Sequence, residues 1–376
     1  MALESRRRGV GVDPHAAEFP KNTGEANSAD PGRRELLVGL TAALAFPGCA
    51  RLGSGDTRGT SVAGLDLVRR IQFDAPNYAH RLAWSHDGQR VALGGLLDKR
   101  LSVWDVRTGA RFPAPGDQIG GTHALAYSPD GRYLAVARAP IAAAGGGQRR
   151  YTVSLWDART GVLVRNLVET DPAEISEIEA RSIAFSADSR YLAVVYGAQV
   201  AVYLLDSQGE ARRQSTVEMR ALTCAFRPDN ATLACLQMGG SAQTALLRIS
   251  DGKILDSFGG LALAQAWSLD GKLLALAREG GVALLDVVNR NVERTLSVDE
   301  RVAYVTLSFS ADRRWLAGMA SQRLDLWNTQ TWTRTGTLLA RTDHGQLFQD
   351  GAYSPQMALV GLTGGNQTTI WKARNS

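Results

Sequence analysis

One short pattern recurs seven times along this chain and restricts the folds that are open to it. Each copy has two alternating apolar stretches joined by a turn rich in Ser, Asp and Gly, as in ALAYSPDGRYLAVA from Ala124. This pattern is typical of a tight β-hairpin, because Pro and Gly satisfy the backbone angles of such a turn. A third apolar stretch follows each hairpin. The aromatic residues that open the seven turns are Trp84, Tyr127, Phe185, Phe226, Trp267, Phe309 and Tyr353.

The spacing of these aromatic residues identifies the repeat. They lie 41 to 44 residues apart, except for one step of 58 residues between Tyr127 and Phe185. A period of roughly 40–45 residues is that of one four-stranded propeller blade. The third stretch ends on Trp-Asp at Trp104-Asp105 and Trp156-Asp157. On these features residues 67–373 resemble the WD-repeat family, which implies an all-β fold, a seven-bladed β-propeller of four-stranded blades.

The first predicted strand, Leu67–Phe73, precedes the first hairpin and has no local partner. The last repeat ends at Trp371 after three strands, so its outer edge is unpaired. Unpaired edges are unfavourable, and closing the ring removes two of them at once. The sequence therefore predicts that this N-terminal strand closes the last blade.

The N-terminal region resembles an export signal. Residues 1–48 include Arg33 and Arg34, an apolar run, and Pro47-Gly48 before Cys49. The arginine pair followed by a short apolar run and a cysteine resembles a twin-arginine signal joined to a lipoprotein cleavage box. The resemblance implies lipid on Cys49 and a periplasm-facing protein of the cell envelope that is held to the membrane. A simple cleaved signal and a chance Arg pair in a cytosolic protein are the alternatives.

The segment that follows Cys49 separates this signal from the repeats. Residues 49–63 are rich in Gly, Ser and Thr and predict a flexible tether, and residues 64–376 contain the propeller.

Two connections around the second blade are unusually long. They are Arg138–Arg150 and Glu169–Ala180, and a propeller places both on the same face. Binding residues are concentrated on long loops of rigid scaffolds. We therefore predict that Arg149, Arg150 and the acidic residues of the Glu169–Ala180 connection form the outer part of a partner surface. The alternative is that both are solvent loops, because added loop length costs little free energy.

The position four residues before each turn aromatic predicts the rim of the central channel. His80, His123 and Arg181 occupy it in blades one to three, and Arg81 follows His80. We therefore predict that a protein partner binds His80, Arg81, His123 and Arg181 as an inner rim. The same position is polar in blade seven and apolar in blades four to six, where it holds Leu222, Leu263 and Val305.

The sequence contains none of the common catalytic or cofactor motifs. It has no nucleophile elbow, P-loop, dinucleotide fingerprint or paired-Cys zinc spacing. Its net charge of +5 is dispersed, which argues against nucleic acid. We expect no catalytic residues, no cofactor and no metal, and a non-enzymatic protein–protein interaction platform. The alternatives are an envelope propeller enzyme similar to lactonases or quinoproteins, and a cytosolic WD-repeat scaffold.

Cys224 and Cys235 flank one predicted hairpin and lie opposite each other across its two strands. In an exported protein they could form a disulfide, and as buried residues they could pack as thiols.

Overall fold

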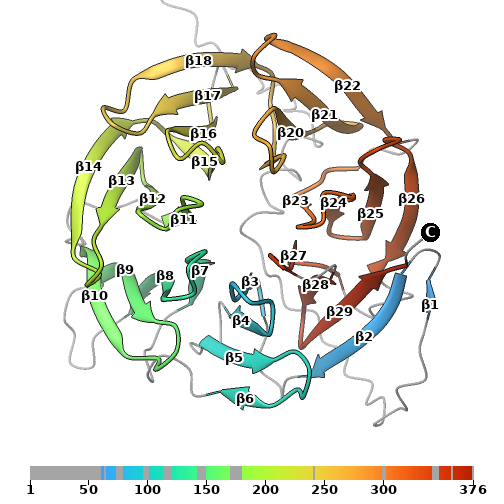
Figure 1. The fold of residues 1–376 in the computed structure, drawn as a ribbon, viewed down its shortest axis with the longest axis horizontal. Coiled ribbons are helices and arrows are strands. Elements are labelled where there is room, and N and C mark those ends of the chain that lie inside the picture. The colour runs from blue at the N-terminus through green and yellow to red at the C-terminus, as the bar shows by residue number, and fades with distance from the viewer. Residues whose placement is uncertain are drawn as a thin grey trace, which may run out of the picture. The chain divides into compact units, whose positions relative to one another are not determined.

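The computed structural model describes residues 61–62, 65–72, 79–95, 101–112, 121–141, 150–169, 180–239, 242–298, 302–340, 347–356 and 359–374. Within these ranges the chain forms seven antiparallel sheets arranged around a central axis (Figure 1). The predicted all-β fold, a seven-bladed propeller, is confirmed. The predictions for Arg33, Arg34 and Cys49 concern residues outside the described ranges.

In blades one to six the strands follow one another in sequence from the centre outwards. Blade one comprises β3 (Arg81–Trp84), β4 (Arg90–Gly94), β5 (Leu101–Asp105) and β6 (Arg111–Phe112). Blade two comprises β7 (Thr122–Tyr127), β8 (Tyr133–Ile141), β9 (Arg150–Asp157) and β10 (Leu163–Glu169). Blade three comprises β11 (Ala180–Phe185), β12 (Tyr191–Tyr196), β13 (Gln199–Leu205) and β14 (Ala211–Glu218). Blade four comprises β15 (Ala221–Phe226), β16 (Thr232–Gln237), β17 (Gln243–Arg248) and β18 (Ile254–Gly259).

Blades five and six have the same order, and in blade seven β2 and β1 occupy the two outermost positions. Blade five comprises β19 (Ala264–Trp267), β20 (Leu273–Arg278), β21 (Gly281–Asp286) and β22 (Asn291–Ser297). Blade six comprises β23 (Thr306–Phe309), β24 (Trp315–Ala320), β25 (Arg323–Asn328) and β26 (Arg334–Leu339). Blade seven comprises β27 (Asp350–Tyr353), β28 (Leu359–Gly364), β29 (Gln367–Ala373), β2 (Leu65–Gln72) and β1 (Ser61–Val62).

The N-terminal strand closes the ring as predicted. β2 pairs antiparallel with β29, from Leu65 opposite Ala373 to Gln72 opposite Gln367. The structure differs at two points, because the strand begins at Leu65, two residues before the predicted start, and β1 adds a short fifth strand on the outer side of β2. Residues 61–62 were expected in the flexible tether, and a two-residue strand is too short to leave an alternating pattern in the sequence.

The hairpin turns repeat one hydrogen-bond pattern. In blade two, Ser128 Oγ donates to Asp130 Oδ1 (2.6 Å), which also accepts from the backbone N–H of Arg132 (3.0 Å). Gly131 lies between them with φ of 73°. In blade six Arg313 adopts this left-handed conformation, with φ of 59°. The side-chain bonds fix the turn locally, which explains why the Ser-x-Asp pattern recurs with the blade period.

The core lies between neighbouring blades. Trp156, Trp327 and Trp371 are buried there, as their equivalent positions predict. Trp104 was expected to be buried in the same way but is only half-buried. The strand outside it, β6, has two residues, whereas β10 outside Trp156 has seven, so the rim of blade one covers less of its tryptophan. No helix within the described ranges is long and apolar enough to span a bilayer.

Candidate functional site

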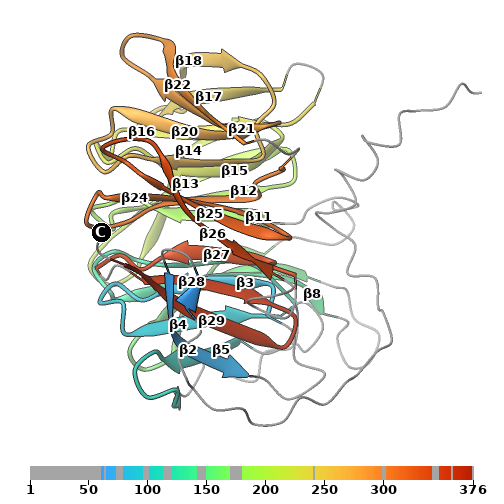
Figure 2. The ribbon, with the colours of Figure 1, turned by 90° about the vertical axis from the view of Figure 1, so that its right-hand side faces the viewer.

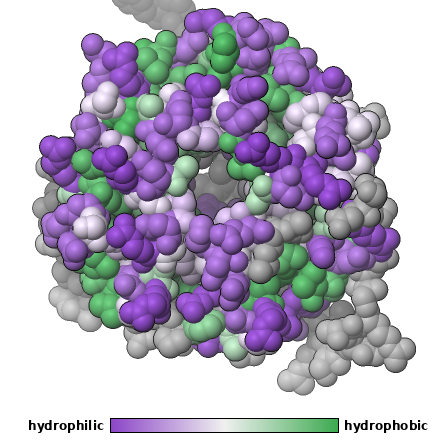
Figure 3. All heavy atoms as spheres, in the orientation of Figure 1, coloured by the Kyte–Doolittle hydropathy of each residue, from purple (hydrophilic) through white to green (hydrophobic). Residues whose placement is uncertain are grey.

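The propeller has two faces with different kinds of connection. One face, here the turn face, carries the hairpin turns between the first and second strands of the blades, such as residues 128–132. The other, the connection face, carries the links between second and third strands and those between blades, such as residues 260–263. Figure 2 shows the blades from the side, and Figure 3 shows an opening at the centre of the ring among largely hydrophilic residues. The predicted rim residues lie at the connection-face end of the innermost strands.

Arg81 links the first two blades at this end of the channel. Its Nε donates to the backbone carbonyl of His123 (2.6 Å), and Nη1 donates to the carbonyl of His80 (2.9 Å). The structure therefore brings these three predicted residues together. Since the guanidinium is engaged by backbone carbonyls of blades one and two, Arg81 has a structural role in joining the blades.

Blade seven completes this polar cluster through Asp350 and Gln349. Asp350 Oδ2 accepts from the backbone N–H of Leu82 (2.9 Å), which ties blade seven to blade one. Burial raises the pKa of Asp350, and the charge of Arg81 opposes this effect. Burial and Arg81 lower the pKa of His80, and a hydrogen bond with Gln349 acts in the opposite direction. His80 is therefore neutral at pH 7 and Arg81 is the cation of the cluster.

Arg181 is separate from this cluster and has few partners. It is half-buried at the start of β11, and among the described residues its Nη1 donates only to the thioether sulfur of Met238 (3.1 Å). Its Nε is buried without a hydrogen-bond partner in the part of the chain that the structure describes. A guanidinium has five N–H donors, and a thioether is a weak acceptor. Arg181 thus keeps strong hydrogen-bonding capacity available at the channel mouth.

The apolar part of the mouth is larger than the repeat position alone predicts. Leu222 and Leu263 are half-buried and Val305 is exposed, as part of an arc over blades four to six. Leu261 is 58% exposed and Leu347 is also exposed, on the links that lead into blades five and seven. Neither residue is predicted from the strand pattern, because these links lack the alternation that marks the strands. The sequence does carry one signal for both, which is an apolar residue two positions before the rim position of the same blade.

The predicted outer rim is only partly within the described ranges. Arg150 begins β9, but its side chain is not described, and Arg149 and residues 170–179 lie outside those ranges. Their part in a partner surface stays a prediction. Among the described side chains, no group of three or more His, Cys, Asp or Glu residues could hold a metal ion.

Cys224 and Cys235 lie directly opposite each other on β15 and β16. Both are buried free thiols that pack between blades three and four. Burial raises the pKa of Cys224 to about 12, and a hydrogen bond with Ser182 only partly offsets this. The thiols are therefore protonated at neutral pH, and protonated thiols are weak nucleophiles.

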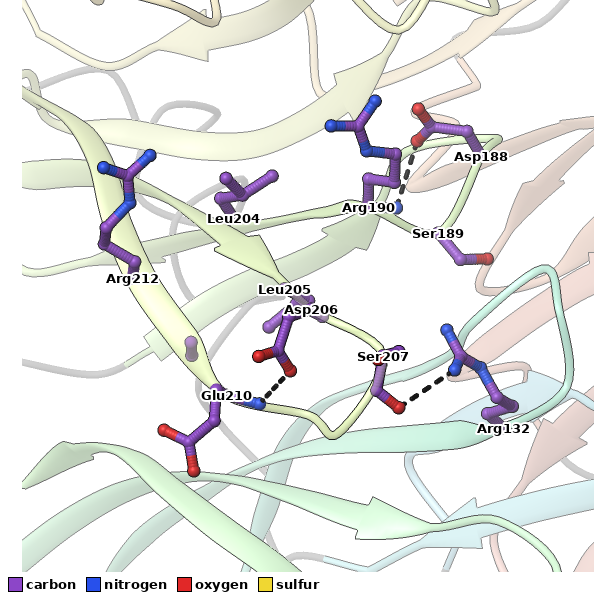
Figure 4. A pocket seen from close by; sticks show the side chains of 11 residues that line it. Arg132, Asp188, Ser189, Arg190, Leu204, Leu205, Asp206, Ser207, Glu210 and Arg212 are labelled. Atoms are coloured by element: carbon purple, nitrogen blue, oxygen red, sulfur yellow. Dashed lines mark hydrogen bonds between the residues drawn. The ribbon is translucent and has the colours of Figure 1, made fainter.

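A cleft on the turn face was not predicted. It has a volume of about 590 Å³ and lies beside the outer strands of blade three, with Arg132 of blade two at one end (Figure 4). Its polar side chains come from Arg132 of blade two and from blade three, and its apolar lining comes from Leu204, Leu205 and Ala211. The sequence does not reveal this cleft, because turns from two blades form it and each turn alone has an ordinary sequence.

No family model matches this chain, and no curated protein shows significant similarity to it.

Proposed function

We propose that this propeller is a non-enzymatic interaction platform of the WD-repeat type, and that a protein partner binds its connection face around the channel mouth. The observation that carries the proposal is the guanidinium of Arg181, which among the described residues has only a weak acceptor, the sulfur of Met238. Protein interfaces commonly combine an arginine anchor with apolar contacts and a polar rim. The same end of the channel carries the exposed apolar residues Leu261 and Val305 on the links into blades five and six.

The bonding of the rim residues separates structural roles from binding roles. Arg81 and Asp350 bond to neighbouring blades, so their removal would loosen the ring. Arg181 has no such bond to lose, apart from its contact with Met238. Its guanidinium is therefore the best anchor for a carboxylate or carbonyl of the partner.

We predict that Arg181→Ala weakens partner binding by at least about 1 kcal/mol and leaves the melting temperature nearly unchanged. The matched control is Arg313→Ala, which removes one exposed charge from the turn face. The partner is first captured in cells through a photo-crosslinking residue at position 305, and its affinity for the purified variants is then measured by titration calorimetry. Crosslinks that form from position 313 and never from position 305 would place the partner on the turn face and contradict the proposal.

We also propose that the protein is a lipoprotein of the cell envelope, from the resemblance of Arg33, Arg34 and Cys49 to export and lipidation signals. Cys49→Ser is expected to abolish lipid attachment and move the protein from the membrane fraction to the soluble fraction. Arg33→Lys with Arg34→Lys is expected to block export while expression continues. Fractionation and mass spectrometry of the N-terminal peptide measure both effects. Membrane attachment that persists in Cys49→Ser would contradict lipid anchoring.

A further inference from the structure

The register of blade four brings two cysteines face to face. Cys224 on β15 lies directly opposite Cys235 on β16, and the register shift of this strand pair lies outside them, between Ala221 and Thr223. Both side chains belong to the core that packs between blades three and four, so both project from the same face of the sheet. Directly opposed side chains on one face of an antiparallel pair are close cross-strand neighbours.

The hydrogen bonds of this hairpin show which kind of cross-strand pair the cysteines form. The backbone N–H of Arg227 donates to the carbonyl of Thr232 (2.9 Å), and bonded and non-bonded pairs alternate along an antiparallel ladder. Three residues back along β15, Cys224 and Cys235 therefore form a non-hydrogen-bonded pair. The backbone N–H of Cys224 agrees with this, because it points away from β16 and donates to Ser182 Oγ of blade three (3.3 Å).

A non-hydrogen-bonded pair fits the dimensions of a disulfide. The Cα atoms of such a pair lie about 4.5 Å apart, within the range of about 4.4–6.8 Å that disulfides span. Its Cβ atoms are also closer together than those of a hydrogen-bonded pair. A bond between the two sulfur atoms therefore requires little movement of the backbone.

Burial restricts when this bond can form. Cys224 is 5% exposed and Cys235 is 0% exposed, so an oxidant in solution does not reach either sulfur once the blades have packed. The hairpin of residues 221–237 can form before that packing, because its contacts are local in the sequence. Thiols on an unpacked hairpin are in contact with water, and their ionised fraction attacks disulfides. Oxidation therefore belongs to the folding stage.

We infer that Cys224 and Cys235 form an intramolecular disulfide when the chain folds in the presence of a small disulfide such as oxidised glutathione, and that they remain thiols when it folds in a reducing medium. The structure shows the thiol state. Packing of blade three against blade four then retains whichever state has formed. The redox condition of the medium at the time of folding is thereby fixed in the native ring, independently of any partner at Arg181.

The reaction is a thiol–disulfide exchange in two steps. One cysteine thiolate attacks the small disulfide, which forms a mixed disulfide with the protein and releases one small thiolate. The second cysteine thiolate attacks the protein sulfur of the mixed disulfide, which forms the bond across the hairpin and releases the second small thiolate. Two protein thiols are oxidised and one small disulfide is reduced, and the protons lost by the cysteines are taken up by the released thiolates.

The inference is tested by cell-free synthesis of the full chain with Cys49→Ser, which leaves Cys224 and Cys235 as its only cysteines. Free thiols are alkylated with N-ethylmaleimide in denaturant, and the intact mass is measured. Synthesis with oxidised glutathione should give a chain that is lighter by two hydrogen atoms and carries no maleimide. Synthesis with dithiothreitol should give a chain with two maleimide groups. A cooperative melting transition checks that each product has folded.

The matched control exchanges two neighbouring residues, Cys224→Ala with Ala225→Cys. Successive side chains of a strand point to opposite faces, so the moved cysteine lies on the other side of the sheet from Cys235 while the number of thiols is unchanged. This variant should form no internal disulfide and should keep its thiols or carry glutathione on them. An internal disulfide in the control to the same extent would overturn the inference, as would two free thiols in the parent chain after folding with oxidised glutathione.

A second measurement uses the oxidised parent chain and tests the retention of the bond. Dithiothreitol should reduce the disulfide at least about tenfold more slowly in native buffer than in urea, because reduction requires blades three and four to separate. Equal rates in the two media would show that the packing of the blades does not retain the redox state.

Discussion

Deletion of residues 1–75 is expected to unfold the propeller, whereas deletion of residues 1–60 leaves it folded. The longer deletion removes β2 and with it the only strand that pairs with the outer edge of β29. It also removes Leu65 and Ile71, which are buried against blades six, seven and one. Burial of these two side chains contributes about 3–6 kcal/mol, which is comparable with the whole net stability of many domains, about 5–15 kcal/mol.

Thermal melting followed by circular dichroism, together with size-exclusion chromatography, distinguishes the two truncations. The shorter deletion should keep a cooperative transition and elute as a compact species. The longer one should aggregate or lose the transition, and a synthetic peptide of residues 61–75 should restore part of it. Identical melting of both truncations would show that β2 does not hold the ring closed.

Trp156→Ala is expected to lower the free energy of unfolding by about 3–5 kcal/mol, the usual cost of removing a buried tryptophan. The indole of Trp156 is buried between blades one and two, and Arg138 Cζ lies 5.5 Å from the centroid of its ring. Urea unfolding of the purified variant measures the loss.

Trp104→Ala is the matched control for this substitution. Its indole N–H donates to Ser102 Oγ at 2.9 Å, just as that of Trp156 donates to Ser154 Oγ at 2.9 Å. The local bond is therefore the same in both blades, whereas the burial of the two side chains differs. Trp104→Ala should cost roughly half as much, because half-buried side chains lose less area from water. Equal losses would mean that burial between blades is not what makes Trp156 important.

The architecture could be predicted because its signals are local and repeat with a fixed period. The hairpin turns of blades one, two, three, five and six carry their own Ser-x-Asp bonds, so each of these turns is specified within five residues, as in residues 128–132. Strand alternation between the turns then gives the blade, and the unpaired edge at Trp371 requires a closing strand.

The functional surfaces could be predicted only in part, because they depend on contacts between blades. The sequence places His80, Arg81 and His123 on one rim, but it does not reveal that the Arg81 guanidinium bonds to backbone carbonyls. In the same way, the cleft on the turn face brings Arg132 of blade two together with Arg212 of blade three, and nothing in the sequence of either turn indicates this contact between blades.

Closure by β2 also sets an order of events during biosynthesis. Asp66 and its ion-pair partner Arg374 are 308 positions apart, so the ribosome makes β2 about 300 residues before its partner strand β29. Pairings of such long sequence separation form slowly. While synthesis continues, β2 has an open edge that can pair with other chains. Closure of the ring therefore depends on protecting β2 until β29 has emerged from the ribosome. A stalled or truncated chain that lacks β29 would leave β2 exposed to aggregation and proteolysis.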